Sequence, residues 1–403
     1  MIKAAIMGHG TVGSGVYEVF EMNADKIARV TGEAVEVKYV LDLRDFSALS
    51  YGHKFVSDFA VIENDPEITV VAEVMGGVGA AYQFTKRLLA AGKSVCTSNK
   101  ELVATHGEEL LKIAEEHNVN YMFEASVGGG IPIIRPMIQC LAANEFNEIC
   151  GILNGTTNYI LTQMIHNGVK FEDALKQAQV NGYAEADPTA DIEGHDACRK
   201  ICILSDLAFG DKFEPDEVPC EGITKITLED VANADKLGCV IKLLGRAVRN
   251  EDGSAYAYVA PHLIRKESPL AAVEDVFNAI MVDGNATGEV MFYGKGAGKL
   301  ATASAVVADM LDCIEHRAQR RRISWGDGSK KLLRPIDTLK SAWYVRFKGT
   351  QSDLESVLPV DSVTEPAHGV VVVQTRKMST AEMREKREVL ARKGQVLAAM
   401  RML

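Results

Sequence analysis

Residues 3–13 read KAAIMGHGTVG, and this stretch decides the fold. A short apolar run ends in three glycines with the G-x-G-x-x-G spacing, and a helical pattern follows to about Phe20. Gly8 permits a tight turn, Gly10 lets a pyrophosphate approach the backbone, and Gly13 lets the helix pack closely on the strand. A preceding strand and a following helix are the context that this motif requires. The pattern predicts a dinucleotide-binding unit, and a glycine-rich turn without a ligand is the alternative.

Further strands alternate with helices along the first third of the chain, which predicts a parallel sheet. These strands are expected at residues 35–41, 69–75, 94–97 and 120–123. The strand 35–41 ends in Asp42 and, two residues later, Arg44. An acid at this place binds the ribose of NAD, whereas an arginine accepts the 2′-phosphate of NADP. Since both are present, the choice between NAD and NADP stays open, and a surface role for Arg44 is the alternative.

Two more strand ends carry polar groups. Lys100 follows the strand 94–97 and opens a helix, at the edge where open α/β sheets bind ligands, although a plain surface lysine is the alternative. Glu124 follows the strand 120–123 and precedes three glycines, so that one carboxylate lies near several backbone carbonyls. An all-oxygen set of this kind suits a hard cation. Spacing alone, however, favours a turn that simply carries an acid.

Residues 182–204 read GYAEADPTADIEGHDACRKICIL and combine many acids with glycine and proline. The glycines and the proline predict a shaped loop that leads into a helix, with Asp191 as a candidate N-cap. Asp196 and Lys200 are spaced i, i+4 and therefore share one helix face. Apolar residues follow them, so the pair is expected to be buried, to bind a polar substrate and to move a proton. The alternative is a surface pair worth only ~0.3–0.5 kcal/mol.

Length and composition limit the possible classes of protein. The 403 residues are enough for two or three domains, and the net charge of −11 argues against a nucleic-acid partner. From the sequence we expect no signal peptide, and no apolar run approaches the ~18–20 residues of a membrane span. The eight cysteines form no C-x-x-C pair, which predicts a cytoplasmic, reducing environment without a zinc site.

The order of these patterns predicts three domains of α/β and α+β class. A Rossmann dinucleotide-binding domain is expected over 1–150, with a return helix at about 300–320 after a tight turn at 294–298. An α+β substrate-binding and dimerisation domain is expected over 151–322, and a small α+β domain over 340–403. The small domain shows strand patterns at 343–347, 360–364, 369–375 and 395–401 and a helical pattern at 380–392.

Several motifs coincide with one family: GHGTVG at 8–13, TSNKEL at 97–102, EASVGGGIP at 124–132, NGTTNYIL at 154–161, GYAEADPTADIEGHDACRK at 182–200 and GKGAG at 294–298. Together they resemble homoserine dehydrogenase over residues 1–320. The resemblance implies an NAD(P)-dependent oxidoreductase acting on a CH–OH group. Its reaction interconverts L-homoserine and L-aspartate 4-semialdehyde, on the route from aspartate to threonine and methionine.

The resemblance also implies roles for individual residues. Lys200 is expected to exchange a proton with the substrate hydroxyl, with Lys100 as a second lysine of the site. The residues expected to hold the substrate are Glu185 and Asp196, supported by Asp191. The cofactor contacts are expected from Gly8, Gly10, Thr11, Val12, Gly13, Arg44, Thr97, Lys100, Gly182 and Gly298. A monovalent cation, sodium, is expected at the Glu124 carboxylate and the carbonyls of Val127, Gly129 and Ile131.

Some points depart from the family pattern or stay open. Lys295 stands where the family commonly has a small residue or proline. The C-terminal segment resembles an ACT domain, but residues 349–354 lack the expected acid-x-x-Gly turn, so effector binding and a purely dimerising role are both open. A homodimer or homotetramer is expected. Two alternatives compete with the dehydrogenase: a non-catalytic NAD(P) sensor, and a semialdehyde dehydrogenase that uses a thiol such as Cys96 or Cys150.

Overall fold

A computed structural model of the chain describes residues 1–317, 319–367 and 369–403. The chain divides into two compact units, each made of three segments. Unit 1 comprises Met1–Phe146, Cys202–Pro215 and Gly284–Lys330, and unit 2 comprises Asn147–Ile201, Asp216–Asp283 and Lys331–Leu403. Across these described ranges, no helix is both long enough and apolar enough to cross a membrane.

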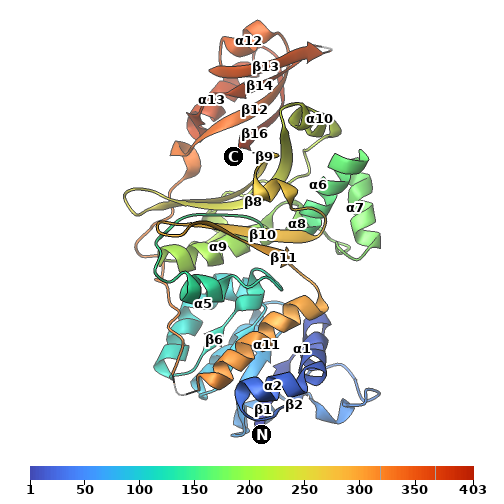
Figure 1. Cartoon of the computed structure of the whole chain (residues 1–403), viewed down its shortest axis with the longest axis vertical. Helices are drawn as coiled ribbons and strands as arrows, with labels where there is room; N and C mark the ends of the chain where they lie inside the picture. Colours follow the sequence, from blue (N-terminus) through green and yellow to red (C-terminus); the bar gives the residue numbers. More distant parts are fainter. Residues whose placement is uncertain (318, 368) are drawn as a thin grey trace. The chain divides into compact units, whose positions relative to one another are not determined.

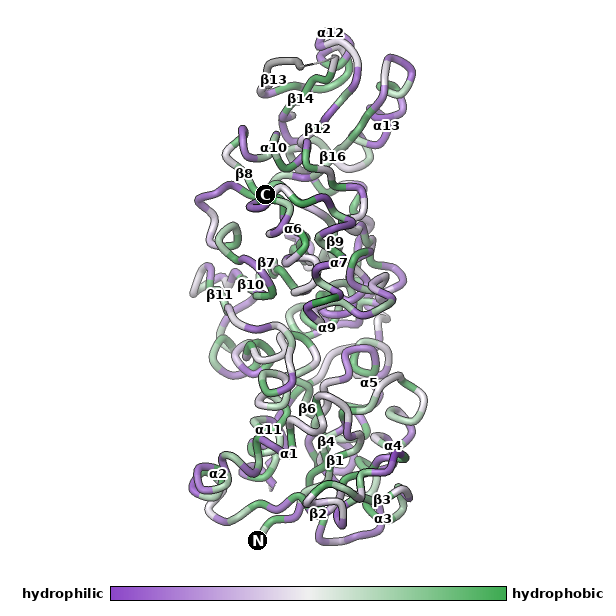
Figure 2. Tube along the Cα trace, turned by 90° about the vertical axis from the view of Figure 1, so that its right-hand side faces the viewer, coloured by the Kyte–Doolittle hydropathy of each residue, from purple (hydrophilic) through white to green (hydrophobic). Residues whose placement is uncertain are grey.

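Unit 1 contains a six-stranded parallel sheet with the order β3-β2-β1-β4-β5-β6. Its strands are β1 (Ile2–Met7), β2 (Val35–Leu41), β3 (Phe55–Val56), β4 (Ile68–Glu73), β5 (Ser94–Thr97) and β6 (Tyr121–Met122). The central strands β1 and β4 are buried almost throughout, since their apolar runs are covered on both faces. Figure 2 shows these strands in the hydrophobic colour. This is the strand order of the Rossmann fold, so the predicted parallel α/β sheet is confirmed.

Helices cover this sheet: α1 (Thr11–Met22), α2 (Ala24–Thr31), α3 (Phe59–Asn64), α4 (Gly79–Ala90), α5 (Lys100–Glu116) and α11 (Lys299–Glu315). Helix α11 comes from much later in the sequence and packs against α1 and β4 (Figure 1). Its contact with α1 is close at Gly15, where a Cβ atom would lie only 2.7 Å from the carbonyl oxygen of Lys299. The helix predicted over about 300–320 thus exists, and it ends at Glu315.

A second sheet has the order β11-β10-β7-β8-β9-β16-β12-β14-β13, with β15 paired to β12. Its strands are β7 (Phe146–Ile152), β8 (Cys239–Arg249), β9 (Ala255–Arg265), β10 (Phe277–Gly284), β11 (Gly288–Lys295), β12 (Lys340–Lys348), β13 (Val360–Ala367), β14 (Val370–Thr375), β15 (Met378–Ser379) and β16 (Gln395–Met402). Strands β8 and β9 form a long antiparallel hairpin. Strand β16 pairs parallel with β9 and antiparallel with β12, so the C-terminal strands continue the same sheet.

The remaining helices are α6 (Gly155–Asn167), α7 (Phe171–Val180), α8 (Thr189–Ile192), α9 (His195–Phe209), α10 (Leu228–Lys236), α12 (Gln351–Glu355) and α13 (Thr380–Leu390). Helices α10 and α13 each begin with a capping box, in which the N-cap hydroxyl and the N3 carboxylate bond each other's backbone N–H. The N-cap of α10 is Thr227, and its N3 residue is Asp230. These caps fix where both helices begin.

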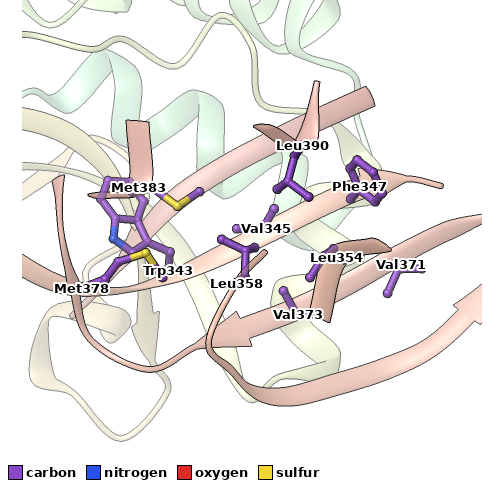
Figure 3. Packing of buried hydrophobic residues seen from close by; sticks show 10 residues of the cluster. All are labelled: Trp343, Val345, Phe347, Leu354, Leu358, Val371, Val373, Met378, Met383 and Leu390. Atoms are coloured by element: carbon purple, nitrogen blue, oxygen red, sulfur yellow. The ribbon is translucent and has the colours of Figure 1, made fainter. Parts of the chain in front are cut away.

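The C-terminal elements form a module, defined here as residues 340–402, with the succession β12-α12-β13-β14-α13-β16 and the two-residue strand β15 between β14 and α13. Its strands lie in the order β16-β12-β14-β13, and all neighbouring pairs are antiparallel. The apolar side chains of both helices and of the strands meet in one core cluster, drawn in Figure 3. In that view Trp343, Met378 and Met383 gather at one end of the cluster, and Phe347 and Leu390 at the other.

The elements differ from the predicted ones in several places, among them the following. Strand β3 was not predicted, because two residues are too few to show a periodic pattern. Helix α12 was not predicted; it overlaps residues 349–354, which lack the acid-x-x-Gly turn of an ACT domain, and the Thr350 side chain caps it by accepting from the Asp353 N–H. The turn expected at 294–298 is shorter, since β11 continues to Lys295.

Candidate active site

The glycine-rich turn has the geometry of a phosphate-binding loop. Gly8 has a φ of +97°, which favours glycine, and a Cβ atom at Gly13 would lie 1.9 Å from the Gly8 carbonyl oxygen. Beside Gly10, in contrast, no atom lies within 4 Å of the place of a Cβ. Thr11 and Val12 begin α1, whose first backbone N–H groups have no partner within the helix. The turn therefore leaves room for a pyrophosphate at the N-terminus of α1.

A cavity of about 520 Å³ adjoins this turn, lined by the ends of β1, β2 and β4. One wall is apolar and includes Phe59 and Phe84, whose rings stack with centroids 4.1 Å apart. Opposite charges lie at the end of β2, where the Asp42 carboxylate accepts from the backbone N–H of His9 at 2.8 Å and from the Arg44 guanidinium at 2.9 and 3.0 Å. The Arg44 bonds hold the pKa of Asp42 well below its usual range. The cavity fits the adenosine half of a dinucleotide.

Thr97 is the last residue of β5, and Lys100 follows it at the carboxyl end of this strand. The Thr97 side chain is buried: its Oγ1 donates to Glu73 at 2.6 Å and accepts from the Asn99 N–H at 2.9 Å. A contact from Thr97 to a cofactor would therefore use its backbone. Lys100 is the first residue of α5 and is half-buried. Burial raises the pKa of the Glu73 carboxyl to about 7.

The loop after β6 surrounds the Glu124 carboxylate with backbone. Both oxygens of Glu124 accept N–H bonds, from Ile133 at 2.6 Å, Ile134 at 2.8 Å and Arg135 at 2.7 Å. Asp309 of α11 accepts from the Glu124 N–H at 2.8 Å and from the Arg135 side chain at 2.6 Å. Burial raises the pKa of Asp309 to about 7. Helix α11 thus holds this loop in place.

Three carbonyl groups of the same loop have a different environment. Val127, Gly129 and Ile131 are buried, and their carbonyl oxygens accept no hydrogen bond from any residue in the described ranges. Buried carbonyl groups are normally paired. An all-oxygen set of one carboxylate and unpaired carbonyls has the chemistry of a site for a hard cation.

In unit 2, Lys200 and Asp196 lie together on α9. Both are buried, with exposed fractions of 7% and 4%, which excludes the alternative of a surface pair. The Lys200 Nζ donates to the Asp196 carboxylate at 2.7 Å and to the carbonyl of Leu153, just after β7, at 2.8 Å. The ammonium group is thereby fixed between a helix and the end of a strand.

Asn154 connects this pair to the loop before α9. Its Nδ2 donates to Asp191 at 2.7 Å and to Asp196 at 2.9 Å, while its Oδ1 caps α6 by accepting from the Thr157 N–H. The expectation that Asp191 caps α9 is wrong, because Asp191 lies within the short helix α8. Burial raises the pKa of the Asp191 carboxyl. One amide thus holds two carboxylates beside Lys200.

The other predicted residues lie in exposed turns. The Glu185 side chain is exposed, and its backbone carbonyl accepts from the Gln179 side chain at 3.1 Å. Gly182 has a φ of +73° and Gly298 a φ of +125°, values that favour glycine. At both glycines the space around a Cβ is open, so each leaves its backbone approachable.

The thiols do not suit nucleophilic catalysis. Cys96 and Cys150 have no exposed surface. Burial raises the pKa of the Cys96 thiol, whereas a nucleophilic thiol needs a low pKa and access to substrate. The structure therefore does not favour the thiol-dependent alternative.

Comparison with known proteins decides the family. The sequence model described as homoserine dehydrogenase, NAD binding domain, matches residues 8–124, and the one described as homoserine dehydrogenase matches residues 132–311. The chain belongs to the homoserine dehydrogenase family. The homoserine dehydrogenase of Pseudomonas aeruginosa is 41% identical over 86% of this chain and 82% of its own length. That of Bacillus subtilis is 43% identical over 78% of this chain and 73% of its own length.

Solved structures agree with this assignment. The crystal structure of a homoserine dehydrogenase from Thiobacillus denitrificans has a TM-score of 0.91 and 35% identity, covering 100% of this chain and 98% of that one. A hyperthermophilic archaeal homoserine dehydrogenase in complex with NADPH has a TM-score of 0.66 and 27% identity, covering 77% of this chain and 97% of that one. Our protein is therefore an oxidoreductase of the homoserine dehydrogenase family and binds NAD(P).

Three polar residues of the chain were missed from sequence: Asn154, Glu73 and Asp309. Asn154 opens the NGTTN motif, in which Thr156, Thr157 and Asn158 could cap the helix or line the cleft, and no role was predicted for Asn154 itself. Glu73 ends an apolar strand, and this position next to the glycine-rich turn is a usable signal. Asp309 lies in the apolar part of α11, where an acid between apolar residues signals a buried partner.

Proposed function

We propose that this chain interconverts L-homoserine and L-aspartate 4-semialdehyde with NAD(P), and that Lys200 is the proton donor and acceptor. The observation that carries the proposal is the buried Lys200 ammonium group, fixed by Asp196 at 2.7 Å and by the Leu153 carbonyl at 2.8 Å. In oxidation, an unprotonated Lys200 amine takes the proton of the substrate hydroxyl. In reduction, the ammonium returns it. When bound, the dinucleotide accepts the hydride from C4 or returns it.

The carboxylates beside Lys200 hold the substrate in this proposal. Asp196 and Asp191 share the amide of Asn154, which leaves two negative groups directed at one place. Such a pair suits the α-ammonium group of an amino-acid substrate. Glu185 and Lys100 are assigned to the same site by resemblance, as a further substrate contact and the second lysine.

The experiment follows the absorbance of the reduced nicotinamide with L-homoserine, in parallel with NAD and NADP. Lys200→Ala is expected to lower kcat by roughly 10²- to 10⁴-fold, because the proton has no acceptor. The matched control is Lys176→Ala, which removes an exposed lysine of α7. The better cofactor decides whether Asp42 or Arg44 recognises the ribose.

Two outcomes contradict the proposal. Equal kcat for Lys200→Ala and Lys176→Ala would remove Lys200 from the reaction. Binding of NADPH by the wild type without any homoserine-dependent turnover would favour the sensor instead. A thermal unfolding curve of each variant shows whether a loss of activity reflects a loss of fold.

We also propose a monovalent cation, sodium, at Glu124 and the carbonyls of Val127, Gly129 and Ile131. The unpaired carbonyls support it, because their oxygens are buried without a donor from the described parts of the chain. The three N–H bonds that Glu124 accepts fix its carboxylate at the centre of the loop.

Removal of the cation tests this site. Sodium chloride is expected to raise the thermal midpoint above that in choline chloride of equal ionic strength, because a ligand that binds only the folded state stabilises it. The Glu124→Gln variant is expected to lose this difference, and Glu116→Gln, at an exposed acid of α5, to keep it. The same midpoint in both salts for the wild type would argue against the cation.

Four further expectations stay predictions. A homodimer or homotetramer is supported by β11, an edge strand with the exposed apolar side chains Met291 and Tyr293.

An ACT-like C-terminal domain is supported by the βαββαβ succession of the module. The three domains at 1–150 with the return helix, 151–322 and 340–403 are proposed as described above. A cytoplasmic location rests on the cysteines, since none of the eight, all in described residues, forms a disulfide.

A further inference from the structure

A second pocket lies within unit 2, far in sequence from the motifs of the proposed reaction. It has a volume of about 250 Å³, and its walls come from β9, β12, β16, α13 and residues 219–221. All of these segments belong to the same unit. Trp343 and Met383, at one end of the core cluster in Figure 3, form part of its lining.

Arg401 of β16 is the central charged group of this pocket. It is only 5% exposed, and its guanidinium lies against two rings, 4.6 Å from the centroid of Trp343 and 5.0 Å from that of Tyr258. Its Nη2 donates to the Thr380 hydroxyl at 3.2 Å. Two rings and one hydrogen bond thus hold the guanidinium plane in a fixed orientation.

Among the side chains that the structure describes, no carboxylate forms an ion pair with Arg401, and the acid whose charge acts on its guanidinium is Glu221. Its Nε is buried without an acceptor, and so is the Nε1 of the neighbouring Trp343. Burial lowers the pKa of the guanidinium, because the charged form is less stable away from water. A buried cation and two unsatisfied donors at one pocket are costly unless an acceptor from outside satisfies them.

The rim of the pocket has the same sign of charge. Arg384 and Arg387 of α13 line it, and Arg384 also pairs with Asp337 at 2.6 Å. One acid, Glu221, lines the opposite side and is exposed. Three arginines against one glutamate leave the lining positive, so the pocket attracts anions.

The shape of the donors selects the kind of anion. A guanidinium presents a planar fork, which matches the two oxygens of a carboxylate. Apolar groups line the rest of the pocket, among them Val259, Met383 and Ala399. They suit a short hydrocarbon chain attached to the carboxylate.

We propose that this pocket binds a small carboxylate with a short apolar chain, its carboxylate on Arg401. The ligand fills the pocket between α13 and β9 and accepts hydrogen bonds from the guanidinium of Arg401. The pocket shares no residue with the candidate active site.

Tryptophan fluorescence tests the proposal directly. The chain has two tryptophans, so Trp325→Phe leaves Trp343, which touches Arg401, as the only reporter. Three probes are titrated into this variant: butyrate, the uncharged butyramide of the same shape, and inorganic phosphate. Butyrate is expected to change the emission with saturation in the millimolar range or below, and butyramide to cause no saturable change. No response to butyrate, an equal response to butyramide, or tighter binding of phosphate would each overturn the proposal.

Matched variants connect the signal to Arg401. In the Trp325→Phe background, Arg401→Lys is expected to weaken butyrate binding at least about tenfold, since lysine keeps the charge but loses the fork. Arg376→Lys, at an exposed arginine of the same module outside the pocket, is expected to leave it unchanged. If Arg401→Lys lowers the thermal midpoint too far, Arg387→Gln at the exposed rim replaces it, with a several-fold loss of affinity expected. Unchanged affinity in both pocket variants would overturn the proposal.

Discussion

At the scale of single residues, two buried carboxyl groups make the charge inside unit 1 depend on pH. Glu73 and Asp309 have no exposed surface, and burial raises the pKa of each to about 7. The few hydrogen-bond donors around each carboxylate do not offset its burial. The folded state therefore favours the neutral form more than the unfolded state does. Near neutral pH, small changes of pH therefore alter charges inside unit 1.

Glu73 gives a prediction about stability and pH. Because its pKa rises from 4.5 to about 7, the folded state binds the proton more tightly than the unfolded state, and stability falls as pH rises between these values. The loss is about 3 kcal/mol, complete above the folded pKa. Glu73→Gln is expected to flatten this slope, as measured by denaturant unfolding from about pH 4 to about pH 8. Glu116→Gln is the control, and equal slopes for all three proteins would show that Glu73 is already ionised.

The sequence predicted the chemistry of single residues better than their contacts. The i, i+4 spacing of Asp196 and Lys200 and the apolar residues after them indicated a buried pair, which the structure contains. The bridge from Asn154 could not be seen, because Asp191 and Asp196 lie about forty residues further along the chain. Local spacing does not encode such a contact, since it depends on where β7 and α9 come together.

Among the elements, the turn between β1 and α1 is the most constrained. Gly13→Ala places a Cβ 1.9 Å from the Gly8 carbonyl, so the turn must open. Gly10→Ala meets no atom within 4 Å and has an ordinary φ of −80°. We expect Gly13→Ala to lower the thermal midpoint without cofactor and to weaken NAD(P) binding. Gly10→Ala is expected to keep the midpoint and only to weaken binding, because its methyl group occupies the place of the pyrophosphate.

Thermal unfolding and a titration with NADPH check both variants. Equal midpoints for Gly13→Ala and the wild type would show that the turn accommodates the methyl group. Unchanged affinity in Gly10→Ala would show that the pyrophosphate does not approach this glycine.

Elements with a strong hydrophobic pattern were predictable from sequence, whereas very short elements that depend on a cap were not. Strands β1 and β4 follow mostly apolar runs, and these two strands and β5 were expected close to their observed bounds. Helix α12 has only five residues, fewer than two turns, and depends on the Thr350 cap rather than on an apolar stripe. A pattern based on periodicity cannot detect it.

For whole unit 2, a buried ion pair connects the module to α10. Arg346 of β12 donates to both oxygens of Asp230 at 2.8 and 3.1 Å, and Tyr344 donates to the same carboxylate. Asp230 has no exposed surface, and Arg346 is 6% exposed. We expect Arg346→Met to destabilise unit 2 by about 3–5 kcal/mol, because it leaves a buried carboxylate without its cation.

Denaturant unfolding measures this effect against a surface control. Arg384→Gln breaks the exposed pair with Asp337 and is expected to cost only about 0–1 kcal/mol. A loss of the same small size in Arg346→Met would mean that water reaches Asp230 in the folded state.

The pairing of distant segments was the least predictable feature of the molecule. The sequence indicated a separate sheet at 340–403, but it gave no sign that β16 pairs with β9 through Arg401 and Met402. Strand pairing over such a separation depends on register and on the faces of both strands, which one strand's pattern does not reveal.

The return of α11 to α1 has a consequence for biosynthesis. A ribosome releases β1 to β6 long before Lys299–Glu315, and during that time the surface of α1 around Gly15 has no partner. The nascent dinucleotide-binding unit therefore stays incomplete while β7 to β11 are translated. A fragment that stops after residue 150 lacks this helix, which leaves the face of α1 around Gly15 uncovered. A circular permutant that begins at Lys299 would place α11 ahead of β1 and let the unit form co-translationally.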